Sequence, residues 1–220
     1  MAAQSGAPFS INDIVPIANH LTEAGVVAVK ADSPYKTIEE LVAAAKEKGN
    51  LKASTNGNKA SNHTAAQLLA KSAGFKYKAI PYGGTADQLL ALRQGEVDFT
   101  CAKVADVAKL VKGDKPELRV LAVFNTKRDP ELPNVPTLGE KGLYPEWYGS
   151  ARALVAPKGT KPEVIQYYVE AFKKTMQDPA VIEAHKKAGM ALDFKDNKEL
   201  GDLIKAQDKF ARDVVNDLYK

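Results

Sequence analysis

The sequence predicts an α/β protein in which a parallel sheet is flanked by helices. Short segments rich in β-branched residues alternate with segments of helical periodicity from Gly25 to Phe124. The connections between these segments are short, and several helical segments end at a glycine. Because strands joined through helices usually pair in parallel, this alternation favours a parallel sheet over an antiparallel one.

The first strand and the first helix are predicted at 25–31 and 37–48. The stretch GVVAVKA follows a loose opening segment and is typical of a buried strand. Thr37 and Glu40 have the spacing of a capping box, in which each side chain accepts a hydrogen bond from the backbone of the other residue. Gly49 then ends the helix. The stretch LKAST, which ends at Thr55, is predicted to be the second strand.

The alternation continues through the middle of the chain. A helix is predicted from about Asn62 to Ala73, before Gly74, and another is predicted to begin at Thr85, capped by Thr85 with Gln88, and to end at Gly95. The other elements expected here are strands over 76–82, 96–102 and 118–124 and a helix over 104–112.

From Asn125 the pattern changes, because NTKRDPELPNVPT contains three prolines and few apolar residues. This stretch is predicted to run over the surface. The stretch WYGSARALVAP is predicted to be a strand, and Thr160 with Glu163 suggests a third capping box at the start of a long helix. Two further helices are expected over 179–188 and 197–218.

The composition narrows the class of protein. The chain has 220 residues with 45% hydrophobic content, which suits one large domain or two small ones. Its net charge of +4 comes from interspersed charges of both signs, so we expect no nucleic-acid partner. Its single cysteine, Cys101, excludes an internal disulfide. No apolar run is long enough to span a bilayer, and no signal peptide is visible in MAAQSGAPFS.

Two polar loops are the strongest candidates for a binding site. The loops 55–63 and 81–85 consist largely of Gly, Asn, Ser and Thr, and each joins a strand to a helix. In a parallel sheet such loops meet at one edge, where ligands bind, and helix N-termini favour anions. The alternative is purely structural: Ser61, Asn62 and Thr85 would cap helices, while the two glycines at 83–84 would turn the chain.

No set of residues suited to catalysis or to metal binding is present in the sequence. The three histidines, His20, His63 and His185, lack metal-ligand spacing. Cys101 and His63 are candidates for a nucleophile–base pair, but a buried structural thiol is the simpler interpretation. Trp147 fits a binding-site aromatic and plain packing equally well. We therefore expect no enzyme activity, no cofactor and no metal.

Several segments resemble one known family and occur in its order. They are VVAVKADSPYKTIEELVAAAKEK, STNGNKASNHTAAQLL, IPYGGTADQLLALRQGEVDFTCA, LRVLAVFNTKRDPELPNVPTLGEKG and WYGSARALVAPKGTKPEVI. The chain resembles the solute-binding receptors of tripartite tricarboxylate transporters, the Bug-type periplasmic proteins. The resemblance implies a type II periplasmic-binding-protein fold, a flytrap of two α/β domains. Its first domain is expected to be incomplete, with a lead-in over 1–20, a complete second domain over 21–142, and a returning segment over 143–220.

The resemblance implies that the protein binds a small carboxylate in the periplasm and delivers it to membrane transporter subunits. The alternative is the ligand-sensing effector domain of a transcription regulator, which shares this architecture. Lys103 departs from the family pattern. The residues that we expect to line the site are Thr55, Asn56, Asn58, Ser61, Asn62, His63, Tyr82, Gly83, Gly84, Thr85, Cys101, Lys103 and Trp147.

The part of the family pattern that precedes APFSINDIVPIA has no counterpart in this sequence. We therefore expect apolar residues of the returning segment, among them Ile165, Val169, Leu203 and Ile204, to lack part of their cover. Self-association, pairing with a separate N-terminal portion, or folding of the last helices back onto the second domain would supply that cover.

Overall fold

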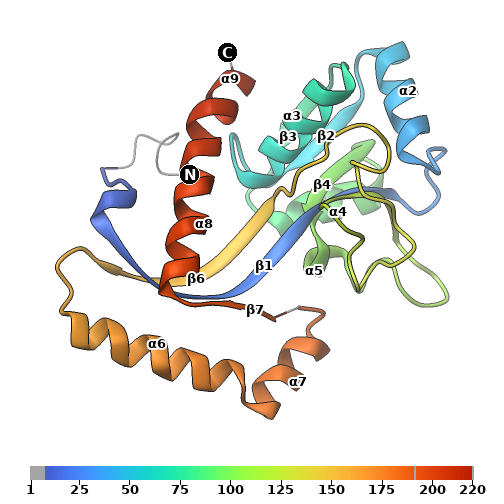
Figure 1. Ribbon diagram of the computed structural model, residues 1–220. Helices are drawn as coiled ribbons and strands as arrows, with labels where there is room; N and C mark the ends of the chain where they lie inside the picture. The colour runs from blue at the N-terminus through green and yellow to red at the C-terminus, as the bar shows by residue number, and fades with distance from the viewer. Residues whose placement is uncertain (1–7, 191, 220) are drawn as a thin grey trace. The chain divides into compact units, whose positions relative to one another are not determined.

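The computed structural model describes residues 8–190 and 192–219, and the chain divides into two compact units. Unit 2 comprises residues 23–150, and unit 1 combines the described parts of 1–22 and 151–220. Strand β1 (Ile14–Lys30) contributes its first half to unit 1 and its second half to unit 2 (Figure 1).

Unit 2 is built on a sheet with the strand order β3-β2-β4-β1-β5. The other strands are β2 (Lys52–Thr55), β3 (Lys78–Pro81), β4 (Phe99–Lys103) and β5 (Leu118–Phe124). As predicted, β2 pairs in parallel with β3 and β4. The expectation of an all-parallel sheet is wrong for β1, which runs antiparallel to both β4 and β5. Its apolar run indicated burial on both faces, but such a run contains no information about strand direction.

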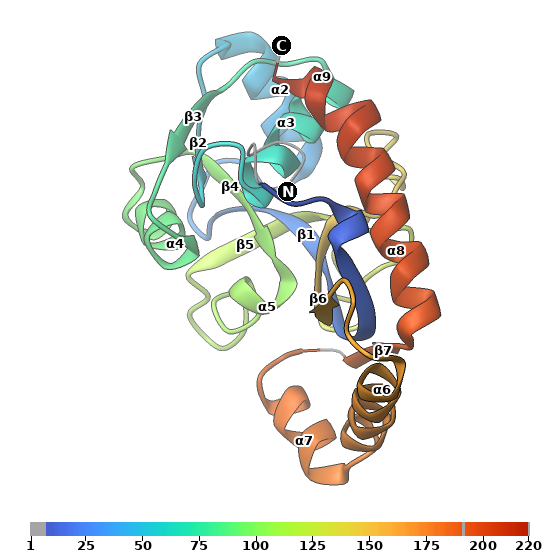
Figure 2. The ribbon, with the colours of Figure 1, turned by 90° about the vertical axis from the view of Figure 1, so that its left-hand side faces the viewer.

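The two faces of this sheet are covered by helices α2 (Ile38–Lys48), α3 (Ser61–Ala73), α4 (Thr85–Gln94) and the short α5 (Val104–Val107). Helices α2 and α3 lie on one face, whereas α4 and α5 lie on the other (Figure 2). On the second face, Leu89 and Leu92 of α4 belong to a buried apolar cluster with Val26 and Ala102 from the strands. This packing holds α4 against the sheet.

The predicted glycines end α2, α3 and α4, but of the predicted N-terminal caps only that of α2 is present. Thr37 and Glu40 form the predicted capping box, and Gly49 ends the helix in a left-handed conformation with φ 67°. The cap position of α3 is Ala60 and that of α4 is Gly84, and neither provides a side-chain cap. The predicted capping roles of Ser61, Asn62 and Thr85 are therefore wrong, because all three residues lie inside the first helical turn. The box at Thr160 is also wrong, since α6 begins at Pro162 after a cap position at Lys161.

Unit 1 consists of three strand segments and the C-terminal helices. The first half of β1 pairs with β6 (Gly149–Pro157) and with the short β7 (Leu192–Lys195). The helices are η1 (Ile11–Asp13), α6 (Pro162–Met176), α7 (Pro179–Lys187), α8 (Asn197–Phe210), the π-helical segment η2 (Ala211–Val215) and α9 (Asn216–Leu218). The first half of β1 was not predicted, because Pro16 interrupts its strand pattern.

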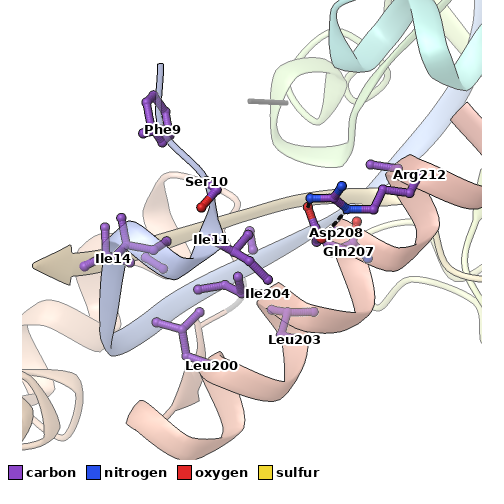
Figure 3. A pocket seen from close by; sticks show the side chains of 14 residues that line it. Phe9, Ser10, Ile11, Ile14, Leu200, Leu203, Ile204, Gln207, Asp208 and Arg212 are labelled. Atoms are coloured by element: carbon purple, nitrogen blue, oxygen red, sulfur yellow. Dashed lines mark hydrogen bonds and ion pairs between the residues drawn. The ribbon is translucent and has the colours of Figure 1, made fainter. Parts of the chain in front are cut away.

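The apolar cover of unit 1 is more complete than the sequence suggested. Ile165 and Val169 are buried in a cluster with Ile17, so the expectation that they lack cover is wrong. In α8, Leu203 and Ile204 remain partly exposed and line an apolar groove with a cavity volume of about 420 Å³ (Figure 3). The groove is also lined by the side chains of η1 and of the start of β1.

Gly149, at the start of β6, lies against the backbone of β1. A Cβ atom at this position would stand 1.9 Å from the carbonyl oxygen of Glu23 and 2.8 Å from Cζ2 of Trp147. No side chain fits in this space, so only glycine allows the two strands to approach this closely.

Candidate functional site

The candidate site lies at one edge of the unit 2 sheet. Since β2 is parallel to β3 and β4, the loops that follow these three strands emerge at the same edge. The backbone N–H of Tyr82, just after β3, donates to the carbonyl oxygen of Thr55 at 2.9 Å. The two polar loops predicted from the sequence are therefore neighbours in space.

The loop between β2 and α3 is held by its own side chains. The Thr55 hydroxyl donates to the carbonyl oxygen of Gly57 at 3.2 Å. The side-chain oxygen of Asn56 accepts a hydrogen bond from the backbone N–H of Asn62 at 3.2 Å. Lys59 has a positive φ of 55°, and its backbone N–H donates to Nδ1 of His63 at 3.0 Å. These bonds fix the direction in which α3 starts, while the side chain of Asn58 is exposed.

A buried amide network ties the start of α3 to α4 and β4. Gln88 is fully buried, and its Oε1 accepts a hydrogen bond from Nδ2 of Asn62 at 2.9 Å. Its Nε2 donates to the carbonyl oxygen of Cys101 at 2.6 Å and to the hydroxyl of Thr100 at 2.5 Å. The Thr100 hydroxyl in turn donates to the carbonyl oxygen of Ser54 at 2.9 Å. This role was not predicted, because the spacing from Thr85 to Gln88 fits a capping box.

Lys103, at the end of β4, reaches the first turn of α3. Its side-chain nitrogen donates to Oδ1 of Asn62 at 2.5 Å and to the hydroxyl oxygen of Ser61 at 3.3 Å. The residue is only 5% exposed. Ser61 and Asn62 from the first polar loop and Lys103 from the end of β4, all predicted for the site, thus come together in one cluster.

The loop between β3 and α4 presents backbone to its surroundings. Gly84 has an extended φ of 177°, and a Cβ atom built there would have no heavy atom within 4 Å. Neither Gly83 nor Gly84 has the positive φ that requires glycine, so the turn itself does not explain the pair. Their effect is to leave the N-terminus of α4 open. The hydroxyl of Tyr82 donates to the carboxylate of Glu96 at 3.0 Å, a contact away from the cluster of Ser61, Asn62 and Lys103.

The aromatic residues near the end of unit 2 differ in role. Trp147 packs against the apolar cluster formed with α4 and α5, which agrees with the second of its two predicted roles, plain packing. Tyr148, which was not predicted for the site, is 1% exposed, and its hydroxyl donates to the carbonyl oxygen of Ser61 at 3.2 Å. A tyrosine next to a predicted site aromatic was the only signal available for it in the sequence.

The structure argues against a Cys101–His63 catalytic pair. Burial raises the pKa of the Cys101 thiol to about 12, so almost no nucleophilic thiolate exists near neutral pH. Burial also lowers the pKa of the His63 imidazole, and its Nδ1 accepts the hydrogen bond from Lys59. The thiol is fully buried, as expected for a structural cysteine.

The buried thiol makes stability depend on pH at the alkaline end. Below the ordinary thiol pKa of 9.0, the thiol is protonated in both states and the stabilisation is fully present. Between pH 9 and about 12 the unfolded chain releases this proton but the folded chain keeps it, so stability falls as pH rises. We expect the free energy of unfolding to fall less steeply between pH 9 and 10 in the Cys101→Ala variant than in the unaltered chain. Urea denaturation of both proteins at several pH values measures the two slopes. Equal slopes in the two proteins would contradict this assignment.

Residues 8–190 and 192–219 provide neither a candidate metal site nor a candidate membrane-spanning helix. Within these ranges no three His, Cys, Asp or Glu side chains form a group that could hold a metal ion. The rings of His20 and His185 lie 5.6 Å apart in unit 1, although their sequence spacing gave no hint of this contact. No helix in the described part of the chain is long and apolar enough to cross a membrane.

Comparison with known proteins gives consistent results. Residues 5–218 match the family described as tripartite tricarboxylate transporter family receptor. The UPF0065 protein in gbd 5'region of Cupriavidus necator is 37% identical over 170 residues, which cover 77% of this chain and 50% of that protein. The chain thus spans about half the length of this relative.

Solved structures support the same fold. A TctC solute binding protein from Polaromonas, crystallised without ligand, has a TM-score of 0.83 and 27% identity, with 99% of this chain and 74% of that chain covered. A protein of R. palustris, solved with adipate, has a TM-score of 0.82 and 21% identity, with 94% of this chain and 70% of that chain covered. The α/β fold expected from the sequence is confirmed by these neighbours.

Proposed function

Because this chain belongs to the receptor family of tripartite tricarboxylate transporters, we propose that it is a non-catalytic receptor for a small carboxylate. It would bind this solute in the periplasm and deliver it to the membrane subunits of a transporter. The match to a receptor family over residues 5–218 favours this function over the effector domain of a transcription regulator.

The observation that carries the proposal is the pair of helix starts at the polar edge of unit 2. Helices α3 and α4 begin at cap positions Ala60 and Gly84, neither of which offers a side-chain acceptor to the first-turn N–H groups. In α3 one of these groups, the N–H of Asn62, already donates to Oδ1 of Asn56, and α4 has no such bond among those described. Such a helix terminus favours an anion through its N–H groups and its dipole. Ser61 and Thr85, the first residues of the two helices, add hydroxyl donors next to the backbone. Carboxylate oxygens accept hydrogen bonds from both kinds of donor.

We further propose that the binding surface includes Asn56, Asn62, Gly83 and Lys103, which lie at or shortly after the ends of the three strands β2, β3 and β4. The thiol of Cys101 and the ring of Trp147 would support this surface by packing rather than by contact with the solute. The ligand of the R. palustris structure, adipate, has the chemistry that this surface suits, that of a small acid with ionised carboxylates.

Removing the two hydroxyls tests the proposal. We expect Ser61→Ala and Thr85→Ala each to weaken carboxylate binding by about 1–3 kcal/mol, because a bound charged group loses one hydrogen bond. Calorimetry with a panel of mono-, di- and tricarboxylates would measure the change. Ser72→Ala is the matched control, since its exposed hydroxyl lies near the other end of α3 and bonds to the carbonyl oxygen of Leu69. Unchanged affinity in both site variants would rule out the two-loop site.

A further inference from the structure

Lys103 is the residue of the site that the family resemblance does not explain. Its ammonium group donates to Ser61 and Asn62, both in the first turn of α3, and the residue is 5% exposed. Lysine is rarely this buried, because its charged group is costly to remove from water. Hydroxyl and backbone N–H donors are enough to recognise a carboxylate, so the buried charge of Lys103 calls for a further explanation.

We propose that Lys103 determines specificity, and that it selects solutes whose carboxylates have no ammonium group beside them. This inference rests on the proposed function, since it concerns which carboxylates the same site accepts. The expected ligands are therefore simple di- or tricarboxylates rather than amino acids.

The geometry of the cluster places the lysine charge where an anion would bind. The Ser61 hydroxyl oxygen and the Lys103 nitrogen are 3.3 Å apart. A carboxylate oxygen that accepts a hydrogen bond from Ser61 then lies about 5 Å from this nitrogen, because the hydroxyl hydrogen points away from the group that donates to the same oxygen. Opposite charges at this separation still attract each other at the effective dielectric constant near a protein surface. The N-terminus of α3 adds positive potential at the same place.

The side chain of Lys103 is held in place before any ligand arrives. Asn62 accepts a hydrogen bond from Lys103 through Oδ1 and donates through Nδ2 to Gln88. Gln88 is itself fixed by its bond to the carbonyl oxygen of Cys101. The ammonium group therefore needs little ordering when a ligand binds, which preserves affinity.

The same charge disfavours an ammonium group on the ligand. A dicarboxylate and the amino acid with the same carbon skeleton differ only by an ammonium group next to one carboxylate. At the effective dielectric constant near a protein surface, two like charges a few ångströms apart repel strongly enough for at least about a tenfold preference. Lys103 and the positive end of α3 both act in this direction.

The experiment uses matched ligand pairs: succinate with aspartate, glutarate with glutamate, and adipate with 2-aminoadipate. Affinities for the chain and its variants would be measured by calorimetry, and the best-bound pair would be analysed. Lys103→Gln removes the charge but retains an amide that can bond to Ser61 and Asn62. We expect the unaltered chain to prefer the dicarboxylate at least about tenfold, and the variant to lose most of this preference.

Lys71→Met is the matched control, because it removes the same charge from the exposed last turn of α3. It should leave the preference unchanged. If Lys103→Gln does not fold by circular dichroism, Lys103→Met, which suits a buried position, provides the same comparison. A melting curve for each variant shows whether the fold is intact.

The outcomes separate this inference from the proposed function. If carboxylates bind but the preference survives in the Lys103 variants, or both ligands of the pair weaken equally, the inference is overturned and the proposed function stands. If the unaltered chain binds none of the mono-, di- or tricarboxylates tested, the proposed function fails, and the role of Lys103 fails with it.

Discussion

Gly149→Ala is expected to destabilise unit 2 by about 3–5 kcal/mol, a large part of the 5–15 kcal/mol typical of a folded protein. The added Cβ atom would stand 1.9 Å from the carbonyl oxygen of Glu23 and 2.8 Å from the ring of Trp147. These contacts cannot be relieved by a side-chain rotation, because one of the two partners is backbone. The backbone of β1 and that of β6 must therefore separate, which loses packing and hydrogen bonds on both sides.

Urea denaturation followed by the fluorescence of Trp147, the only tryptophan in the sequence, would measure this effect. Gly84→Ala is the matched control, since its backbone is extended and a Cβ atom there meets nothing within 4 Å. We expect the control to cost at most about 1 kcal/mol, the usual penalty of alanine at a helix cap. Similar midpoints for the two variants would contradict the argument from close approach.

Gln88→Leu is expected to cost about 3–5 kcal/mol of stability, although leucine has a similar size and is apolar. The substitution leaves Nδ2 of Asn62 and the carbonyl oxygen of Cys101 buried without the bonds that Gln88 supplies. Each buried group that loses its partner costs about 1–3 kcal/mol. Gln88 is therefore a positioning residue, since it holds Asn62, which in turn holds Lys103.

The control for this prediction lies in the same helix. Gln94→Leu changes an exposed residue at the end of α4, and it should alter stability by at most about 0.5 kcal/mol. Urea denaturation of both variants gives the comparison. A cost below about 1 kcal/mol for Gln88→Leu would mean that water replaces the lost bonds and that the network does not hold the site together.

Features that depend on residues close together in the sequence were predicted correctly. The capping box of Thr37 and Glu40 is present, and Gly49, Gly74 and Gly95 end their helices with φ of 67°, 71° and 78°. Strand β5 has the predicted bounds. The resemblance to the receptor family, which rests on longer stretches, is also confirmed.

The rest depended on partners that are distant in the sequence. The same spacing that indicates a cap at Thr37 suggested one at Thr85, where Gln88 instead bonds to groups 12 to 34 residues away. The contact of Lys103 with Ser61 and Asn62 spans more than 40 residues, so no local pattern contains it. The polar loops could be predicted because their composition is itself local. How their side chains are tied together could not.

The two-part construction of unit 1 has a consequence for the order of folding during synthesis. The first half of β1 is synthesised before unit 2, but its partner β6 is complete only after all of unit 2 has been made. Unit 2 is continuous from 23 to 150 and can fold as soon as it emerges. The apolar residues Ile17, Ala18 and Leu21 must wait for segments more than 130 residues later. We expect them to lack their native cover during that interval, a condition that favours aggregation of a partly folded chain.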